Sequence, residues 1–139
     1  MGTLSFIGDP AGFLLDTSTF LRASRVPEKL GKLASAVIED PEAKLFLSSI
    51  SAYEITNKHR LGKLDDYEFV VENYTEIARR LGVIELPVST AHSYLAGSMD
   101  WAHRDPFDRI LLAQAALENL AIITDDAQIK AHNWVETVW

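Results

Sequence analysis

The chain has 139 residues, of which 47% are hydrophobic, enough to build the core of one compact domain spanning residues 1–139. Its 20 aspartates and glutamates outnumber its 13 lysines and arginines, and the resulting net charge of −7 excludes a broad electrostatic grip on nucleic acid. The absence of cysteine excludes disulfides, thiolate metal sites and a cysteine nucleophile.

The sequence carries no signal for membrane attachment. No apolar run reaches the ~18 residues of a membrane span. The opening MGTLSF has neither the basic start of a secretory signal nor the Ser or Thr at position six of a myristoylation signal. We therefore expect a soluble, cytoplasmic protein, and the lack of cysteine suits that reducing compartment.

Strand patterns and helix patterns alternate along the chain. Short apolar runs predict strands within residues 12–18, 44–49, 83–87 and 120–124, and an edge strand within 133–139. Helical spacing of apolar residues predicts helices at 19–24, 27–40, 50–64, 66–82, 89–100 and 106–119. Strands separated by helices favour a three-layer α/β/α domain with a mainly parallel central sheet.

Four acidic residues stand at related places in this pattern. Asp16 follows the first strand, Glu54 lies in the helix after the second, Asp108 opens a helix and Asp126 follows the fourth strand. The carboxyl ends of parallel strands share one edge of a sheet, and open α/β sheets place their sites at that edge. We therefore expect these four side chains, termed the acidic quartet below, to meet there.

Each acidic residue alone also has a structural explanation. A proline at the first helical position makes Asp105 an N-cap and Asp108 the third residue of a capping box. Ser51 can cap a helix in SAYE, and Thr124 or Asp125 can do so in ITDD. The shared location of the carboxylates, rather than any single residue, favours a functional site.

Four neighbouring carboxylates repel one another, so either their pKa values rise or a divalent cation lies among them. A site built from carboxylate oxygens suits Mg²⁺, with Mn²⁺ as a substitute. One or two such ions serve phosphoryl transfer best, because they activate water and neutralise charge on the phosphate. The acidic quartet therefore predicts a metal-dependent hydrolase.

Several stretches, in this order and spacing, resemble the PIN-domain ribonucleases, and most closely the VapC-like toxins of toxin-antitoxin pairs. They are LLDTST at 14–19, Glu54, HRDPFDRILLAQA at 103–115 and AIITDD at 121–126. The resemblance spans nearly the whole chain. Its most specific part is the DPFDR helix start followed by LLAQA.

The resemblance implies a PIN-like fold and a Mg²⁺-dependent endoribonuclease that cuts single-stranded RNA or exposed loops. It makes the acidic quartet (Asp16, Glu54, Asp108 and Asp126) both the metal-binding and the catalytic residues. It also implies a homodimer and a cognate antitoxin protein as the inhibitor. The expected reaction is in-line attack of a metal-oriented water on the phosphodiester, which leaves a 5′-phosphate and a 3′-hydroxyl.

Four further residues are candidates for auxiliary roles. Asp105 is a cap that can add an outer-sphere contact to the metal. The hydroxyls of Thr17 and Thr124 can orient water or phosphate, and each also suits a cap or turn. Arg109 lies in the first turn of a helix, so it can pair with Asp105 or a substrate phosphate, or pack its stem. Asp125 is the weaker candidate of the final aspartate pair.

The remaining polar residues have simpler expected roles. His103 is expected to be a hydrogen-bonded surface group rather than a proton shuttle. Lys58, Arg60 and Lys63 are expected to form a solvated face. The histidines share no metal-binding spacing, which argues against zinc.

Two other functions compete with the ribonuclease. A phosphatase using Asp16 as nucleophile needs a second aspartate two positions later, where this chain has Ser18. A catalytically silent binding module would use the acidic edge only to cap helices and to dock a basic partner. A divalent-ion titration separates the silent module from the nuclease.

Overall fold

The computed structural model describes residues 9–139, so MGTLSF, and with it the predicted absence of a signal sequence, lies outside the described residues. The strands are β1 (Gly12–Leu15), β2 (Leu45–Ser48), β3 (Val83–Leu86), β4 (Leu120–Ile123) and β5 (Thr137–Val138). The helices are α1 (Thr17–Arg25), the 3₁₀ helix η1 (Pro27–Lys29), α2 (Lys32–Glu39), α3 (Ser49–Arg60), α4 (Glu68–Glu72), α5 (Tyr74–Leu81), α6 (Thr90–Ser98), α7 (Pro106–Glu118) and α8 (Ala127–His132).

The five strands form one sheet in the order β3-β2-β1-β4-β5, and every pair is parallel. The central strand β1 is in register with both neighbours, so that Leu15 lies opposite Leu47 of β2 and Ile123 of β4. All five strands therefore end at the same edge. The predicted α/β class with a parallel sheet is confirmed.

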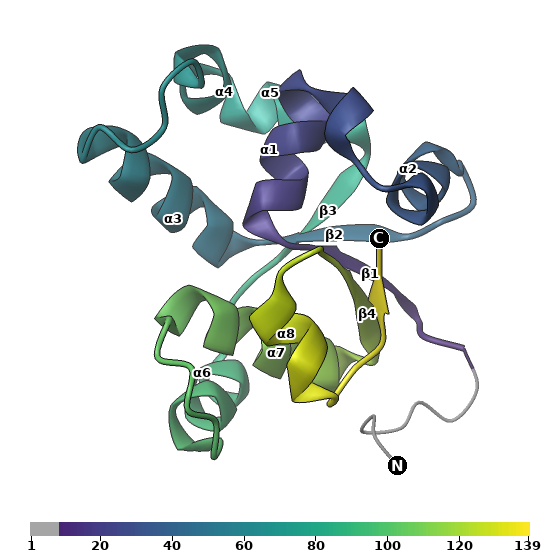
Figure 1. Cartoon of the computed structure of the whole chain (residues 1–139), viewed down its shortest axis with the longest axis vertical. Helices are drawn as coiled ribbons and strands as arrows, with labels where there is room; N and C mark the ends of the chain where they lie inside the picture. Colours follow the sequence, from purple (N-terminus) through teal and green to yellow (C-terminus); the bar gives the residue numbers. More distant parts are fainter. Residues whose placement is uncertain (1–8) are drawn as a thin grey trace.

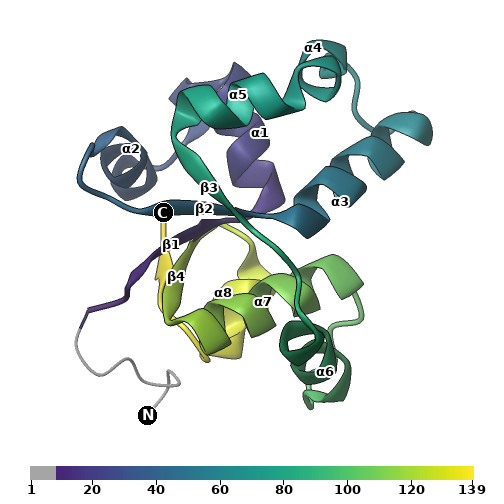
Figure 2. The ribbon, with the colours of Figure 1, turned by 180° about the vertical axis from the view of Figure 1, so that it is seen from behind.

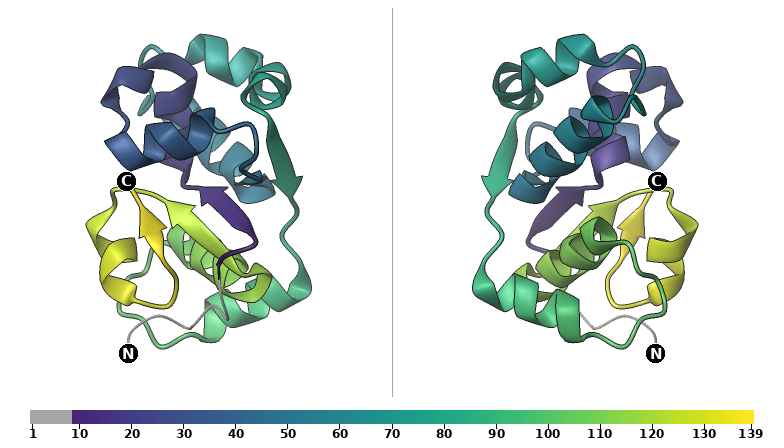
Figure 3. Two further views of the ribbon diagram at one scale, coloured as in Figure 1. Left: turned by 90° about the vertical axis from the view of Figure 1, so that its right-hand side faces the viewer. Right: turned by 90° about the vertical axis from the view of Figure 1, so that its left-hand side faces the viewer.

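Helices cover both faces of this sheet (Figure 1). Helices α1 to α5 pack on one face, and α6, α7 and α8 pack on the other, as the view from behind also shows (Figure 2). Successive residues of β1 point to opposite faces, because side chains alternate along a strand. Leu14 accordingly joins the apolar cluster of the second layer, whereas Leu15 joins that of the first. The side views show the two helical layers separated by the sheet (Figure 3).

Two predicted helices are each divided in the structure. The range expected as one helix at 27–40 contains two: the short η1 comes first, and α2 follows with Gly31 as its N-cap. A Cβ on Gly31 would lie 2.5 Å from the backbone of Trp139, so only glycine lets the chain end pack there. The helix expected at 66–82 breaks at Asn73, whose side-chain amide donates to the carbonyl of Phe69. Prediction of single helices was therefore wrong at both places.

Two predicted caps were also misplaced. Helix α3 begins at Ser49, and its N-cap is Ser48, three residues before the predicted cap Ser51; the Ser48 hydroxyl accepts from the amide of Ile50 at 3.1 Å. The N-cap of α8 is Asp126, instead of Thr124 or Asp125. The predicted N-cap at Asp105 is confirmed, since its carboxylate accepts from the amide of Phe107 at 2.9 Å.

Within the described part of the chain, no helix combines the length and the apolar character needed to cross a membrane.

Candidate active site

The sheet brings the predicted acidic residues to its carboxyl edge. Asp16 follows β1 directly, and Asp126 comes three residues after β4, the strand next to β1. Glu54 is delivered by α3, which continues directly from the other neighbour, β2. Asp108 comes from the first turn of α7, a helix that contacts α3.

Asp16 is almost fully buried, with 7% of its surface exposed. Thr124 donates its hydroxyl to Oδ2 of Asp16 at 2.6 Å, and the amide of Ser18 donates more weakly to Oδ1 at 3.4 Å. Burial raises the pKa of Asp16 in spite of these two hydrogen bonds, and the charges of Glu54 and Asp126 raise it further. Two hydrogen bonds thus hold the Asp16 carboxylate in a buried place that disfavours its negative charge.

Asp108 is a second acid of the site whose pKa is raised. Burial raises its pKa to about 7, and the charges of Asp105, Asp16 and Asp126 act in the same direction. A hydrogen bond opposes this shift, because Nε2 of His103 lies 2.7 Å from Oδ2 of Asp108. At neutral pH without a cation, Asp108 is therefore close to half protonated.

Glu54 has no capping role in this structure. Because α3 begins at Ser49, Glu54 is its sixth residue rather than its third, yet only 6% of its surface is exposed. Its charge raises the pKa of Asp16. The charges of Glu54 and Asp126 thus act on Asp16, and those of Asp16 and Asp126 act on Asp108.

A lysine enters this site. Nζ of Lys58 lies 2.6 Å from Oε2 of Glu54, one helical turn earlier. Burial disfavours the ammonium charge, but the hydrogen bond to Glu54 and the charges of Glu54, Asp105 and Asp108 outweigh it and raise the pKa of Lys58. The side chain of Lys58 is 43% exposed, as a solvated face predicts, but the prediction did not include its pair with Glu54, for which the spacing of four residues was the signal in the sequence.

Thr124 and the last two aspartates have distinct roles. The Thr124 hydroxyl joins two acids, since it donates to Asp16 and accepts from the amide of Asp126 at 3.0 Å. One oxygen of Asp126 accepts from the amides of Gln128 and Ile129 at the start of α8. Asp125 instead pairs with Arg22 at 3.0 Å on the surface.

Thr17 is 3% exposed, and its hydroxyl lies 2.8 Å from the hydroxyl of Ser51. This buried contact ties the start of α1, which directly follows Asp16, to α3, which carries Glu54. Thr17 therefore holds the supporting structure together.

Arg109 uses its guanidinium within the protein. Its three nitrogens donate four hydrogen bonds to main-chain carbonyls at the end of α6 and in the following loop. The acceptors, at 2.6 to 2.9 Å, are the carbonyls of Ala96, Met99, Trp101 and His103. The sequence predicted a pair with Asp105, a contact to a substrate phosphate or packing of the stem, and the structure instead shows hydrogen bonds to main-chain carbonyls. Arg109 thus fixes the loop that presents His103 and Asp105.

The donor set fits a hard divalent cation. His103, Asp105 and Asp108 each offer one ligand atom, and these three atoms lie within 4.8 Å of one another. The remaining donors, from Asp16, Glu54 and Asp126, are carboxylate oxygens, the ligands that Mg²⁺ and Mn²⁺ prefer. Burial is the main cause of the raised pKa values of Asp16 and Asp108, and neighbouring carboxylates add to it; a bound cation would oppose both effects.

The pKa of Asp108 predicts a pH dependence of stability. Between its ordinary pKa of 3.8 and about 7, folded Asp108 keeps a proton that the unfolded chain releases. Folding stability is therefore lost as the pH rises through this window. We expect Asp108→Asn to remove this loss and to stabilise the metal-free protein at pH 8 by about 2 kcal/mol.

Thermal unfolding of wild type and Asp108→Asn in a chelator, from pH 4.5 to 8, measures the difference. The two stability curves should diverge as the pH rises. Parallel curves would contradict the raised pKa of Asp108.

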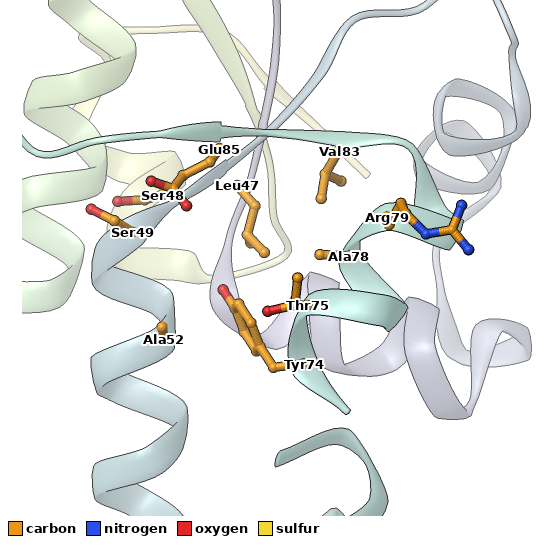
Figure 4. Close-up of a pocket in the computed structure, with 10 residues that line it drawn as sticks. All are labelled: Leu47, Ser48, Ser49, Ala52, Tyr74, Thr75, Ala78, Arg79, Val83 and Glu85. Carbon is orange, nitrogen blue, oxygen red and sulfur yellow. The ribbon is translucent and has the colours of Figure 1, made fainter. Parts of the chain in front are cut away.

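A separate hollow of about 310 Å³ lies beside the acidic edge, between α3, α5, β2 and β3 (Figure 4). Leu47, Ala52, Ala78 and Val83 supply apolar lining, and Tyr74, Arg79 and Glu85 add polar groups. Burial, together with the charge of Glu85, raises the pKa of Tyr74 to about 12, so its hydroxyl stays protonated. None of the acidic quartet lines this hollow.

A parallel sheet covered on both faces, with buried carboxylates gathered at its carboxyl edge, defines the class of this domain. The family model of the PIN domain matches residues 13–135. The chain belongs to the PIN domain family, as its sequence motifs predicted. PIN domains are generally nucleases, and they generally use divalent metal ions.

Solved structures share this fold. One is the crystal structure of VapBC2 from Rickettsia felis bound to a DNA fragment from their promoter, with a TM-score of 0.61, 13% identity, and coverage of 91% of this chain and 98% of that chain. Another is FitAcB from Neisseria gonorrhoeae, with a TM-score of 0.62, 19% identity, and coverage of 90% and 95%. A search of curated proteins found no match.

Proposed function

We propose that this PIN domain is a Mg²⁺-dependent endoribonuclease and the toxin of a toxin-antitoxin pair. The observation that carries the proposal is the acidic quartet at one edge of the sheet, where burial and the charges of neighbouring carboxylates raise the pKa values of Asp16 and Asp108. Caps alone do not account for it, because Glu54 is buried in the second turn of α3.

The acidic quartet would hold the ion or ions. A bound divalent cation supplies positive charge for the phosphate and lowers the pKa of a water molecule. The chain's own contribution is to fix the carboxylates: Thr124 holds Asp16, and the α8 amides hold Asp126. This rigidity matters because small displacements of reacting groups are costly to the rate.

Cleavage of a defined RNA panel tests the activity. The purified protein should cut single-stranded RNA in Mg²⁺, and in Mn²⁺ as a substitute, and should stop in EDTA. Analysis of the ends should find 5′-phosphate and 3′-hydroxyl. No cleavage with either ion would favour a catalytically silent PIN-like binding module, and 2′,3′-cyclic phosphate ends would contradict the water attack.

The toxin role has its own test. Expression of this chain alone should arrest the growth of a bacterial host, and co-expression of the small reading frame beside its gene should relieve the arrest. Normal growth at good expression of active nuclease would contradict the toxin role without contradicting the activity.

The charge of the site suggests how such an antitoxin would inhibit. A guanidinium matches carboxylate geometry and replaces part of the charge of a metal ion, so an arginine-bearing antitoxin segment suits the acidic quartet. The neighbouring hollow between α3 and α5 offers apolar lining for the rest of that segment (Figure 4). We also expect a homodimer in the cytoplasm, which light scattering of the purified protein tests.

Lys58 should serve substrate binding rather than metal binding. Its ammonium pairs with Glu54 and would compete with a cation for that carboxylate, and a positive charge at this place favours the phosphate of a bound RNA. We expect Lys58→Gln to raise the KM for RNA about 3- to 10-fold, and to lower the Mg²⁺ concentration that gives half-maximal rate.

Steady-state kinetics over RNA and Mg²⁺ concentration measures both effects. Lys63→Gln is the matched control, because it removes one positive charge from an exposed position just beyond α3. Equal effects of the two variants would mean that only net charge matters.

A further inference from the structure

An aromatic pair lies at the mouth of the acidic site. Tyr53 of α3 is 61% exposed, and its ring centroid is 5.7 Å from that of Phe107 in the first turn of α7, with the rings 69° apart. Tyr53 immediately precedes Glu54, and Phe107 immediately precedes Asp108. The pair therefore connects the two helices that deliver these carboxylates.

The exposed face of α3 continues from this pair. Asn57 and Arg60 follow Tyr53 by four and seven residues, which places all three on one side of the helix. Arg60 donates to the side-chain oxygen of Asn57 at 2.7 Å. The row is about 10 Å long, since each residue of a helix rises by about 1.5 Å. An aromatic ring, an amide and a guanidinium thus stand in line beside the site.

The charge of this row contrasts with that of the whole protein. The chain carries a net charge of −7, but the last turn of α3 contains Lys58, His59 and Arg60. Helix α3 and the start of α7 lie on the same side of the molecule (Figure 1; Figure 2). The exposed ring of Tyr53, supported by the half-buried ring of Phe107 and followed by Arg60, is complementary to an unpaired base and the phosphate backbone beside it.

We infer that Tyr53 and Phe107 stack against a nucleobase of single-stranded RNA next to the cleaved phosphodiester, and that Arg60 binds the backbone beyond it. The inference rests on the proposed ribonuclease function and names the side chains that would contact the base next to the cleaved bond. Proteins that bind single strands combine aromatic platforms with a positive track. A base inside a duplex is already stacked on its neighbours, so the platform selects loops and single strands.

Kinetics on a single-stranded RNA that the wild type cuts tests the platform. Tyr53→Ala should raise the KM about 5- to 100-fold, the range that loss of one stacked base gives, and change kcat less. Tyr53→Phe retains the ring and should stay near the wild type. Tyr94→Ala is the matched control, because Tyr94 is a tyrosine exposed to 78% on α6.

A substrate lacking one base supplies the second readout. An abasic nucleotide beside the cleaved bond should raise the KM of the wild type and should not raise that of Tyr53→Ala further. Arg60→Gln should reduce the salt dependence of binding by about one phosphate contact. If RNA is cleaved but Tyr53→Ala behaves as Tyr94→Ala does, the platform is refuted and the nuclease stands. If no RNA is cleaved, the proposed function itself has failed.

Discussion

Asp16→Asn and Asp108→Asn should each lower kcat for RNA cleavage at least about 10³-fold while the protein remains folded. Each change keeps the shape of the side chain but removes the charge that would hold a cation. The fold should tolerate both, because asparagine is also a good N-cap at position 16 and because a buried, repelled carboxylate disappears at position 108. Single-turnover cleavage assays measure the loss of rate, and thermal unfolding in a chelator measures the stability of the fold.

Two neighbouring aspartates serve as controls for this result. Asp125→Asn removes a carboxylate that pairs with Arg22 on the surface, so the rate should stay near that of the wild type. Asp105→Asn should have an intermediate effect, because asparagine preserves the cap of α7. Turnover retained in Asp16→Asn or Asp108→Asn would refute the acidic quartet. A loss for Asp105→Asn as large as that for Asp108→Asn would make Asp105 a metal ligand.

Arg109→Met should destabilise the fold by about 3 kcal/mol and impair cleavage as well. The methionine retains much of the apolar stem but leaves four carbonyls without the charged donor that the guanidinium supplies. These carbonyls lie at the end of α6 and in the loop that leads to Asp105. Urea unfolding measures the stability, and a kcat decrease at a temperature where the variant is folded measures the effect on the site.

Two comparisons separate the geometry of Arg109 from its charge. Arg109→Lys keeps the charge, but its ammonium cannot match the fork of the guanidinium, so most of the stability should still be lost. Arg79→Met is a matched control, because Arg79 is exposed and pairs only with Glu76 among the described contacts. Its free energy of unfolding should be almost unchanged. Wild-type stability in Arg109→Met would show that solvent replaces the four hydrogen bonds.

Lys58 and His103 mark where sequence reasoning about the site stopped short. Lys58 reaches Glu54 within α3, at a spacing of four residues that the sequence already showed, whereas the course of the loop before α7 brings His103 to Asp108. The packing of α3 against α7 decides that the charges of Asp105 and Asp108 also act on Lys58. The sequence also left Arg109 open between three roles. A guanidinium has a long reach, and its acceptors on α6 and the loop are defined only when α6 and α7 lie side by side.

The sequence by itself determined the α/β class and the order of the elements. It also determined the places of Asp16 and Asp126 after two strands and of Asp108 at the start of a helix. These features depend on local periodicity and on the rule that parallel strands end at a common edge. Glu54 followed from its place in the helix after the second strand, while the competing capping interpretation depended on placing the start of α3 too late.

Only the tertiary structure decided where the helices break and which charges meet. The requirement for glycine at position 31 comes from the close approach of Trp139, more than one hundred residues away. The pKa of Asp108 near 7 depends on burial and on acids that include two from other elements. Both effects fall off within a few ångströms, so they are set by distances in the folded chain. The sequence fixes those distances only through the complete packing of the two helical layers on the sheet.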